Sequence, residues 1–208
     1  DITETRILSQ QLEYQAMHDS LTDLINRAEF ERRLRRILNS PIKEDEHALC
    51  YLDLDQFKVI NDTCGHLAGD ELLRRLSDLL NTVVRKRDTL ARLGGDEFAV
   101  LLEHCQPGQA KRVAEEILET VQSFRFAWEG KRFSLGVSIG LVPINRDSGT
   151  LTDVLSAADA ACYAAKDAGR NRIHVYHSDD TQLSLRRNEM QWVAEIGSAL
   201  EENRLCLA

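Results

Sequence analysis

The sequence lacks several features that define common classes of protein. None of its apolar runs approaches the roughly 18 residues of a membrane span, and no secretory signal is visible. Its net charge is -8, which argues against a general nucleic-acid-binding surface. It contains neither a Gly-x-x-x-x-Gly-Lys-Ser/Thr loop nor a Gly-x-Gly-x-x-Gly turn. If the chain binds phosphate, it does so without either of these glycine-rich loops.

Cysteine and histidine give no sign of a disulfide framework or a zinc site. The five cysteines are odd in number and widely spaced, and no Cys-x-x-Cys occurs: Cys50, Cys64, Cys105, Cys162 and Cys206. The six histidines show no metal-ligand pairing. This usage favours reduced thiols in a cytoplasmic protein. A full-length protein could still be tethered to a membrane upstream of residue 1.

What the sequence does have is a Gly-Gly pair between two apolar runs, in Arg-Leu-Gly-Gly-Asp-Glu-Phe at residues 92–98. This pattern predicts two antiparallel strands joined by a tight turn, since glycine permits the positive backbone dihedrals of such a turn. The turn carries the carboxylates of Asp96 and Glu97 at the tip of a hairpin. In isolation, such a string is usually no more than a solvated acidic turn.

The flanking sequence predicts an α+β sandwich with a mostly antiparallel sheet and helices beside it. Hydrophobic residues make up 43% of the chain, which is ample for a core. Asn26 is a plausible N-cap for a helix that ends at Ser40-Pro41. The other expected helices cover residues 65–83, a stretch that follows Pro107 and Gly108 and reaches Val121, and residues 152–167. The other expected strands cover residues 48–55, 135–141 and 172–176.

Two sets of charged residues suggest nucleotide chemistry. Asp53 and Asp55 lie two apart, so they point to the same side of their strand. If the hairpin pairs beside that strand, Asp53 and Asp96 converge. Magnesium prefers such oxygen ligands, and two aspartates form the metal site in the palms of nucleotidyl transferases. Lys166 and Arg170 are four apart at a helix end and could clamp a triphosphate, or could merely complement the helix dipole.

Several motifs together resemble the GGDEF domain, the diguanylate cyclase family of bacterial signalling. They occur in family order over roughly residues 17–177. The matching stretches are residues 19–27, 53–62, 65–70, 92–98, 138–140 and 158–171. The resemblance implies a ferredoxin-like core of the nucleotidyl-cyclase, palm-like type. It also implies that two GTP are joined into cyclic di-GMP, with release of two pyrophosphates, across a homodimer in which each domain holds one GTP.

The resemblance assigns roles to individual residues. Magnesium or manganese would be held by Asp53, the Leu54 carbonyl and Asp96. Either Asp96 or Glu97 would help to deprotonate the ribose 3′-hydroxyl, and the sequence does not choose between them. Leu93 stands where the family often has an aromatic residue.

The remaining roles concern GTP and the product. Asn61 and Asp70 would read the guanine edge with His66 nearby, and phosphate would be bound by the backbone N–H groups of Phe57 and Lys58 and by the side chains of Lys166 and Arg170. Arg85 and Asp88 form an Arg-x-x-Asp string, and five residues separate Asp88 from the Gly-Gly pair. The family has its inhibitory product site at this position. By itself, this string is usually a surface ion pair.

The resemblance divides the chain into three parts. Residues 1–18 are expected to form a linker and dimerisation helix, and their opening Asp-Ile-Thr-Glu resembles the end of a PAS sensor domain. Residues 19–178 are the GGDEF domain. Residues 179–208 are a linker and the truncated start of an EAL-like phosphodiesterase domain. Two alternatives to a cyclase stay open: a silent GTP-binding module that regulates a downstream EAL domain, and a cyclic di-GMP receptor that uses Arg85 and Asp88.

Overall fold

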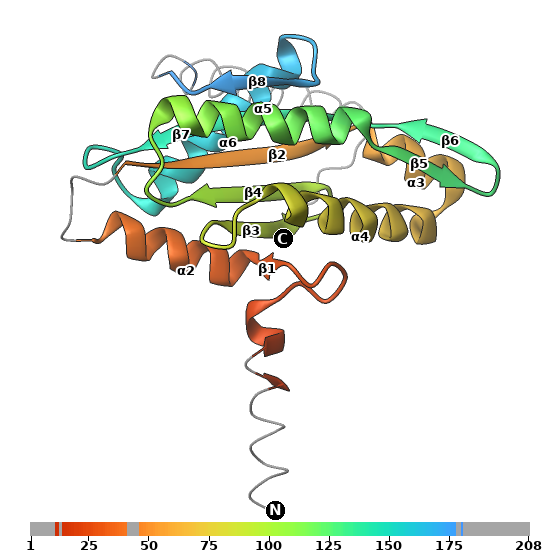
Figure 1. Ribbon diagram of the computed structural model, residues 1–208, viewed down its shortest axis with the longest axis horizontal. Coiled ribbons are helices and arrows are strands. Elements are labelled where there is room, and N and C mark those ends of the chain that lie inside the picture. Colours follow the sequence, from red (N-terminus) through yellow and green to blue (C-terminus); the bar gives the residue numbers. More distant parts are fainter. Residues whose placement is uncertain (1–10, 13, 41–45, 178–179, 181–208) are drawn as a thin grey trace, which may run out of the picture.

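A six-stranded mixed sheet forms the centre of the fold (Figure 1). The computed structural model describes residues 11, 12, 14–40, 46–177 and 180. The sheet order is β1-β3-β4-β2-β7-β8. These strands are β1 (Ile25–Asn26), β3 (Thr89–Gly94), β4 (Glu97–Leu102), β2 (His47–Asp55), β7 (Gly136–Ile144) and β8 (Arg172–Val175). The four central strands are antiparallel, and the two outer strands pair in parallel. The expected mostly antiparallel α+β sheet is confirmed.

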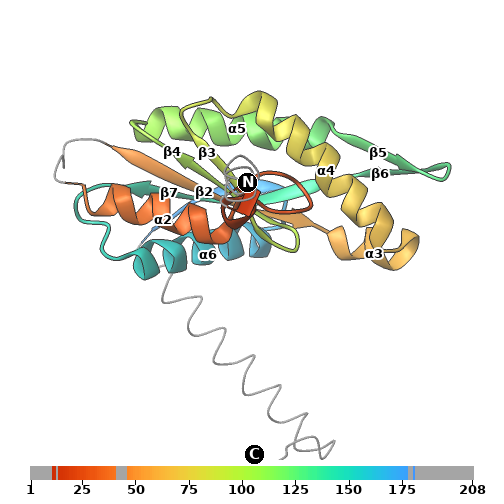
Figure 2. The same ribbon diagram turned by 90° about the horizontal axis from the view of Figure 1, so that it is seen from below.

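Helices cover both faces of this sheet (Figure 2). One face carries α4 (His66–Val83) and α5 (Pro107–Ser123), and the other carries α2 (Arg27–Leu38) and α6 (Leu151–Asp167). The short helix α3 (Phe57–Cys64) directly follows β2 and leads into α4. A separate hairpin of β5 (Arg125–Trp128) and β6 (Lys131–Ser134) projects at one end of the sheet (Figure 1).

The central strand β2 explains why the sheet has two cores. Its side chains alternate between faces, so Leu52 and Leu54 join the cluster under α4 and α5, whereas Leu49 and Tyr51 join the cluster under α2 and α6. By the same alternation, Asp53 and Asp55 continue the α6 side. There Asp53 contacts Lys166 of α6, and Asp55 contacts Ser138 and the Asn171 N–H after α6. The prediction that these two carboxylates share one side is therefore confirmed.

Local sequence signals fix the helices that flank the site. The Asn26 side chain accepts a hydrogen bond from the Glu29 N–H at 3.0 Å, which confirms the predicted N-cap of α2. Helix α6 begins with a capping box between Thr150 and Asp153. The helix packs so closely on β7 that a Cβ at Gly140 would collide with the backbone of α6.

The segment predictions for both ends of the chain fall mostly outside the described residues. Residues 11, 12 and 14–17 are helical, whereas 1–10 and, apart from Asp180, 178–208 are not described. The proposed boundaries of the dimerisation helix and the EAL-like segment therefore stay predictions. Within the described part, no helix is long and apolar enough to cross a bilayer.

Burial raises the pKa of Cys50 and Cys162 to about 12, which makes both thiols unreactive near neutral pH.

Candidate nucleotide and metal site

The β3–β4 hairpin lies directly beside the end of β2. Asp53 is the register partner of Glu97, and the Leu54 N–H donates to the Asp96 carbonyl at 3.2 Å. The turn uses Gly94 and Gly95 with φ of 143° and 52°, a region that favours glycine. The predicted convergence of the hairpin tip on Asp53 is thus confirmed. Because the N–H and C=O of one strand residue point the same way, the Leu54 carbonyl also faces the hairpin.

Arg92 holds the tip of the hairpin in place. Its guanidinium donates to the Gly95 carbonyl from Nε at 3.1 Å and from Nη2 at 2.8 Å. Its Nη1 donates to Asp19 Oδ1 at 3.0 Å, and the same oxygen accepts from the Thr22 hydroxyl at 2.7 Å. The hydrogen bonds of Arg92 therefore hold the turn both to its own backbone and to Asp19, unlike a free acidic loop.

Lys166 of α6 reaches the carboxylate that was predicted to bind metal. Its Nζ lies 2.6 Å from Asp53 Oδ2, and the Asp53 side chain is only 15% exposed. Burial raises the pKa of Asp53, and the nearby carboxylates of Asp96 and Glu97 raise it further, which outweighs the opposing effect of Lys166. Burial acts against the charged form of Lys166, yet the hydrogen bond and charge of Asp53 raise its pKa.

The pKa shifts of Lys166 and Asp53 point to different conclusions about their ion pair. The raised pKa of Lys166 indicates a favourable pair, whereas the raised pKa of Asp53 indicates an unfavourable setting for its charge. Burial acts against both charges. For Asp53, the nearby carboxylates of Asp96 and Glu97 add to the effect of burial. For Lys166, the hydrogen bond and charge of Asp53 and the charge of Asp96 outweigh it. The site therefore holds more negative charge than Lys166 neutralises.

Glu97 is tied to α2 and to the neighbouring strand. Arg27 Nη2 lies 3.3 Å from Glu97 Oε2, while Arg27 Nε donates to the Leu93 carbonyl at 3.0 Å. Burial raises the pKa of Tyr51, and its hydrogen bond with Glu97 raises it further, so the phenol stays protonated. Glu97 thus has two partners that the sequence motifs did not assign.

The prediction that Arg170 lies on one helical face with Lys166 was wrong. Helix α6 ends at Asp167, so Lys166 and Arg170 do not lie four apart on one helical face. Gly169 ends the helix as predicted, and the chain continues through Gly169, Arg170 and Asn171 with φ of 116°, 61° and 50°. The position of Arg170 is therefore set by a left-handed turn after the helix.

The residues predicted to bind guanine lie at the junction of α3 and α4. Asn61 belongs to α3, while His66 and Asp70 belong to the first turns of α4, with only Gly65 between the two helices. The Asn61 amide oxygen is buried and has no hydrogen-bond partner among the described residues. A Cβ at Gly69 would overlap that oxygen, so glycine is required there for Asn61 to reach its place.

Phe57 and Lys58 form the start of α3. This end leaves backbone N–H groups free of helical partners, as a phosphate ligand requires. The preceding residue, Gln56, adopts a left-handed conformation with φ of 63° and ψ of 19°. The chain therefore turns sharply from β2 into α3, which brings these N–H groups near the end of the strand that carries Asp53.

Arg85 and Asp88 line a different hollow, of about 280 Å³, between the end of α4, the start of β3 and the segment before α2. The Asp88 side chain is only 4% exposed, and its Oδ1 accepts a hydrogen bond from the Glu103 N–H at 3.2 Å. Burial raises the pKa of Asp88, against the effect of that N–H and the nearby arginines. Asp88 thus supports the loop after β4, in addition to any role in binding.

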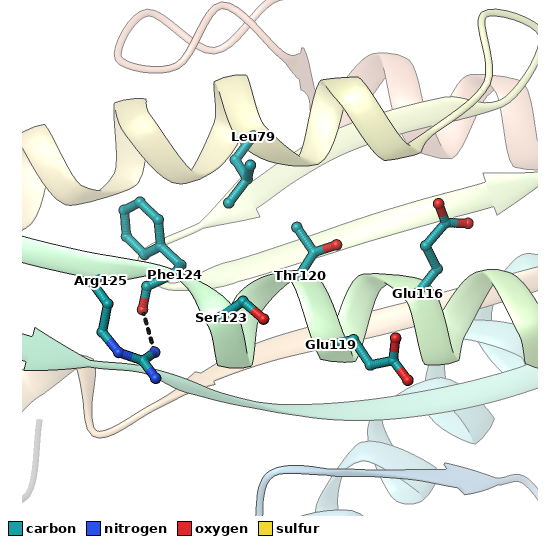
Figure 3. Close-up of a pocket in the computed structure, with 7 residues that line it drawn as sticks. All are labelled: Leu79, Glu116, Glu119, Thr120, Ser123, Phe124 and Arg125. Atoms are coloured by element: carbon teal, nitrogen blue, oxygen red, sulfur yellow. Dashed lines mark hydrogen bonds between the residues drawn. The ribbon is translucent and has the colours of Figure 1, made fainter.

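A larger hollow lies elsewhere on the domain. It has a volume of about 530 Å³ and is lined by residues of α4, α5 and the start of β5, including Leu79, Glu116 and Phe124 (Figure 3). None of the predicted site residues lines it. The size of a hollow therefore does not locate the chemistry in this domain.

Sequence reasoning missed three residues that shape the site. Arg27 and Arg92 lie within the quoted motifs, but no role was assigned to them, although an arginine beside acidic residues is a signal for an ion pair. Asp55 was placed on the correct side of β2 without a function. Its two hydrogen bonds join segments 83 and 116 residues away, which spacing along the sequence does not reveal.

The fold and the site define a nucleotidyl-cyclase-like domain, and comparisons with known proteins identify its family. The family described as "Diguanylate cyclase, GGDEF domain" matches residues 16–172. The chain therefore belongs to the GGDEF diguanylate cyclase family. A probable diguanylate cyclase of Escherichia coli K12, DgcE, is 42% identical over 215 residues, covering 100% of this chain and 19% of the relative.

Other relatives carry different names. The cyclic di-GMP phosphodiesterase PdeB of Shewanella oneidensis is 35% identical and is covered over 24% of its length, with 100% of this chain covered. The chain thus spans about a fifth to a quarter of these two relatives. The coiled-coil and GGDEF domain of DgcB from Caulobacter crescentus, solved in complex with c-di-GMP, is 30% identical with a TM-score of 0.77, and the match covers 84% of this chain and 93% of that one.

Proposed function

We propose that this domain is a diguanylate cyclase that condenses two GTP into cyclic di-GMP and two pyrophosphates. The observation that carries the proposal is the convergence of Asp53, the hairpin tip and Lys166 at one end of the sheet. This arrangement puts a negatively charged oxygen site next to a cationic side chain. Such a pair suits a metal ion and the phosphates that accompany it.

The donor set fits magnesium or manganese. Asp53, Asp96 and the Leu54 carbonyl offer oxygen ligands. Burial raises the pKa of Asp53, and the nearby carboxylates of Asp96 and Glu97 raise it further. No group of three or more His, Cys, Asp or Glu suited to a metal occurs within the described ranges, so nucleotide phosphates would complete the coordination. When bound, the metal would stabilise the attacking and leaving oxygens. Lys166 would neutralise Asp53 beforehand and then turn to phosphate.

Asp96 is the better candidate for the base that accepts the proton of the ribose 3′-hydroxyl. Glu97 already interacts with Arg27 and Tyr51, and both partners stabilise its charge without leaving it free to move toward a substrate. Asp96 lies in the turn at the tip of the hairpin, one residue before the start of β4 at Glu97. Glu97 would then orient the tip through α2.

The guanine base would occupy the junction of α3 and α4. An unpartnered buried carbonyl oxygen is costly, and a ligand that supplies an N–H donor after a small rotation of Asn61 would relieve that cost. Guanine presents such donors, which Asp70 could also accept. His66 would lie beside the base, and the start of α3 would supply the N–H groups of Phe57 and Lys58 to phosphate.

Catalysis would require two copies of the domain, because each 3′-hydroxyl must attack a GTP held by the other copy. The helical residues before the domain expose large apolar side chains, with Leu12 58% and Met17 38% exposed. Pairing through residues 1–18 would cover them and raise the effective concentration of the second half-site. Cyclic di-GMP would inhibit the enzyme at Arg85 and Asp88. The related DgcB domain was solved in complex with c-di-GMP, which supports binding of this ligand by a domain of this type.

A second candidate function is a GTP-binding module that regulates a neighbouring phosphodiesterase without turning over. It is favoured by the relatives named as a phosphodiesterase, PdeB, and as a bifunctional enzyme, MucR of Pseudomonas aeruginosa. The chain covers only 24% and 28% of these proteins. Either function would serve a longer protein with EAL-like and PAS-like neighbours.

One assay separates the two functions. Purified protein at several concentrations is incubated with GTP and magnesium, and the product is identified by mass spectrometry. A cyclase yields cyclic di-GMP with a specific activity that rises with protein concentration, and Asp53→Asn lowers this activity about 100-fold or more. Asp147→Asn, at a loop carboxylate whose side chain is 79% exposed, serves as the control. GTP binding without product supports the regulatory module, and absence of GTP binding contradicts both.

A further inference from the structure

Asp55 is a buried carboxylate whose two hydrogen-bond partners among the described residues are uncharged. It is the last residue of β2 and only 7% exposed. Its Oδ1 accepts a hydrogen bond from the Ser138 hydroxyl at 2.8 Å, and its Oδ2 accepts one from the Asn171 N–H at 2.9 Å. Lys166, the nearest cation on α6, pairs with Asp53 instead. A buried carboxylate is costly unless its oxygens are bonded, so both of these bonds matter to the fold.

The segment that Asp55 holds is strained. Arg170 and Asn171 are not glycines, yet both have positive φ, at 61° and 50°. This left-handed region is less favourable than ordinary backbone for residues other than glycine, so the surroundings must hold the turn in place. Several hydrogen bonds do so. The Arg170 N–H donates to the Ala165 carbonyl at 3.0 Å, Arg172 Nε donates to the Arg170 carbonyl at 3.1 Å, and the Asn171 N–H donates to Asp55.

A glycine on the adjacent strand makes room for this contact. A Cβ at Gly136 would lie 2.9 Å from Asp55 Oδ2 and 3.2 Å from the Asn171 side chain. The first distance is shorter than real Cβ contacts, and the second is tighter than most of them, so a larger residue at position 136 would displace Asp55 or Asn171. Three segments, the end of β2, the start of β7 and the turn after α6, therefore meet at one carboxylate.

We propose that Asp55 is a positioning residue, which fixes the turn at residues 169–171 so that Arg170 is held ready for the triphosphate of the bound nucleotide. This inference rests on the proposed phosphate role of Arg170. It separates two aspartates that look equivalent in sequence: Asp53 pairs with Lys166 at the proposed metal site, whereas both oxygens of Asp55 are already used by Ser138 and Asn171. Asp55 acts on the nucleotide only through Arg170.

A double-mutant cycle tests this inference by equilibrium binding. The probes are 3′-deoxy-GTP, which lacks the attacking hydroxyl, and GMP, which lacks the two outer phosphates. Asp55→Asn keeps the shape but replaces one acceptor oxygen by an N–H donor, so it should weaken 3′-deoxy-GTP about tenfold and GMP less than about twofold. Arg170→Ala should show the same selectivity. In the Arg170→Ala background, Asp55→Asn should cause little further loss, because both changes remove one function.

Two further measurements keep the test decisive. Hydrogen exchange should speed up at the Asn171 N–H in Asp55→Asn while the sheet stays protected, and Ser138→Ala, which leaves the Asn171 contact in place, should have a smaller effect on both readouts. An equal loss for both nucleotides, or an undiminished Asp55→Asn effect in the Arg170→Ala background, would overturn the inference. If Arg170→Ala alone leaves binding of 3′-deoxy-GTP unchanged, the proposed phosphate role of Arg170 fails first, and the positioning role falls with it.

Discussion

The two faces of the central sheet carry different kinds of side chain at the same strand. Under α4 and α5, β2 contributes Leu52 and Leu54 to a continuous apolar core. Under α2 and α6, the same strand contributes Leu49 and Tyr51 and then ends in Asp53 and Asp55. Both faces therefore carry a stabilising core, but only the face under α2 and α6 ends in carboxylates that are available for chemistry.

The largest expected effect on stability lies on the apolar face. Leu76 of α4 is fully buried in the core cluster, and Leu76→Ala should lower the free energy of unfolding by about 2–5 kcal/mol, because it leaves a cavity. Leu67 lies on the same helix but is 77% exposed, so Leu67→Ala should change the stability little. Urea unfolding of both variants makes the comparison. Equal losses for the two would contradict the assignment of this face as a stabilising core.

A polar exception occurs where α3 meets α4. Asn61→Ala should weaken GTP binding by about 1–3 kcal/mol while ATP binding changes much less, because a base-edge partner is lost. Gln109→Ala, at an exposed amide on α5, is the matched control and should affect neither nucleotide. Calorimetric titration with both nucleotides measures the difference. If Asn61→Ala weakened GTP and ATP alike, the guanine assignment would be wrong.

Charge on the α2 side also serves folding, away from the site. Glu29 is buried and is bonded by Arg32 at 2.6 Å and by Arg33 at 2.8 Å. The Arg32 guanidinium lowers the pKa of Glu29 to about 2, with a further contribution from Arg33, against the opposing effect of burial. Because this pKa is depressed, the stabilisation is fully present above the ordinary value of 4.5 and is lost as the pH falls toward 2.

Glu29→Gln should therefore destabilise the domain by about 1–2 kcal/mol at pH 7, a value that allows for the solvent exposure of Arg32. The difference from the unchanged protein should shrink below pH 4.5. Glu115→Gln, at an exposed pair with Lys111 on α5, provides the control. Thermal melts across this pH range measure both. A destabilisation that stayed constant down to pH 2 would show that packing, and not charge, accounts for the role of Glu29.

Much of the fold could be read from local patterns. The Gly-Gly turn, the apolar run of β2 and the Asn26 cap each depend on a few adjacent residues, and each is confirmed. Gly169 even predicted where α6 stops. The prediction that Lys166 and Arg170 share one helical face was wrong, because Gly169 lies between them and ends the helix. The helical spacing of four therefore did not apply.

The parts of the site that the sequence did not reveal depend on distant contacts. The pairing of Lys166 with Asp53 joins α6 to β2, and the bond from Asn171 to Asp55 spans 116 residues. No periodicity encodes such a meeting. The inward position of Asp88 was likewise unpredicted, because whether a loop carboxylate faces solvent or a backbone N–H depends on how β3 and β4 pack.

We propose above all that the end of the α6 face binds a divalent metal together with GTP. Manganese, as a paramagnetic probe, measures this directly by electron paramagnetic resonance titration in the presence of saturating 3′-deoxy-GTP. We expect that the unchanged protein binds manganese, that Asp53→Asn weakens this binding about tenfold or more, and that Asp147→Asn leaves it unchanged. Manganese bound as tightly by Asp53→Asn as by the unchanged protein would contradict the claim.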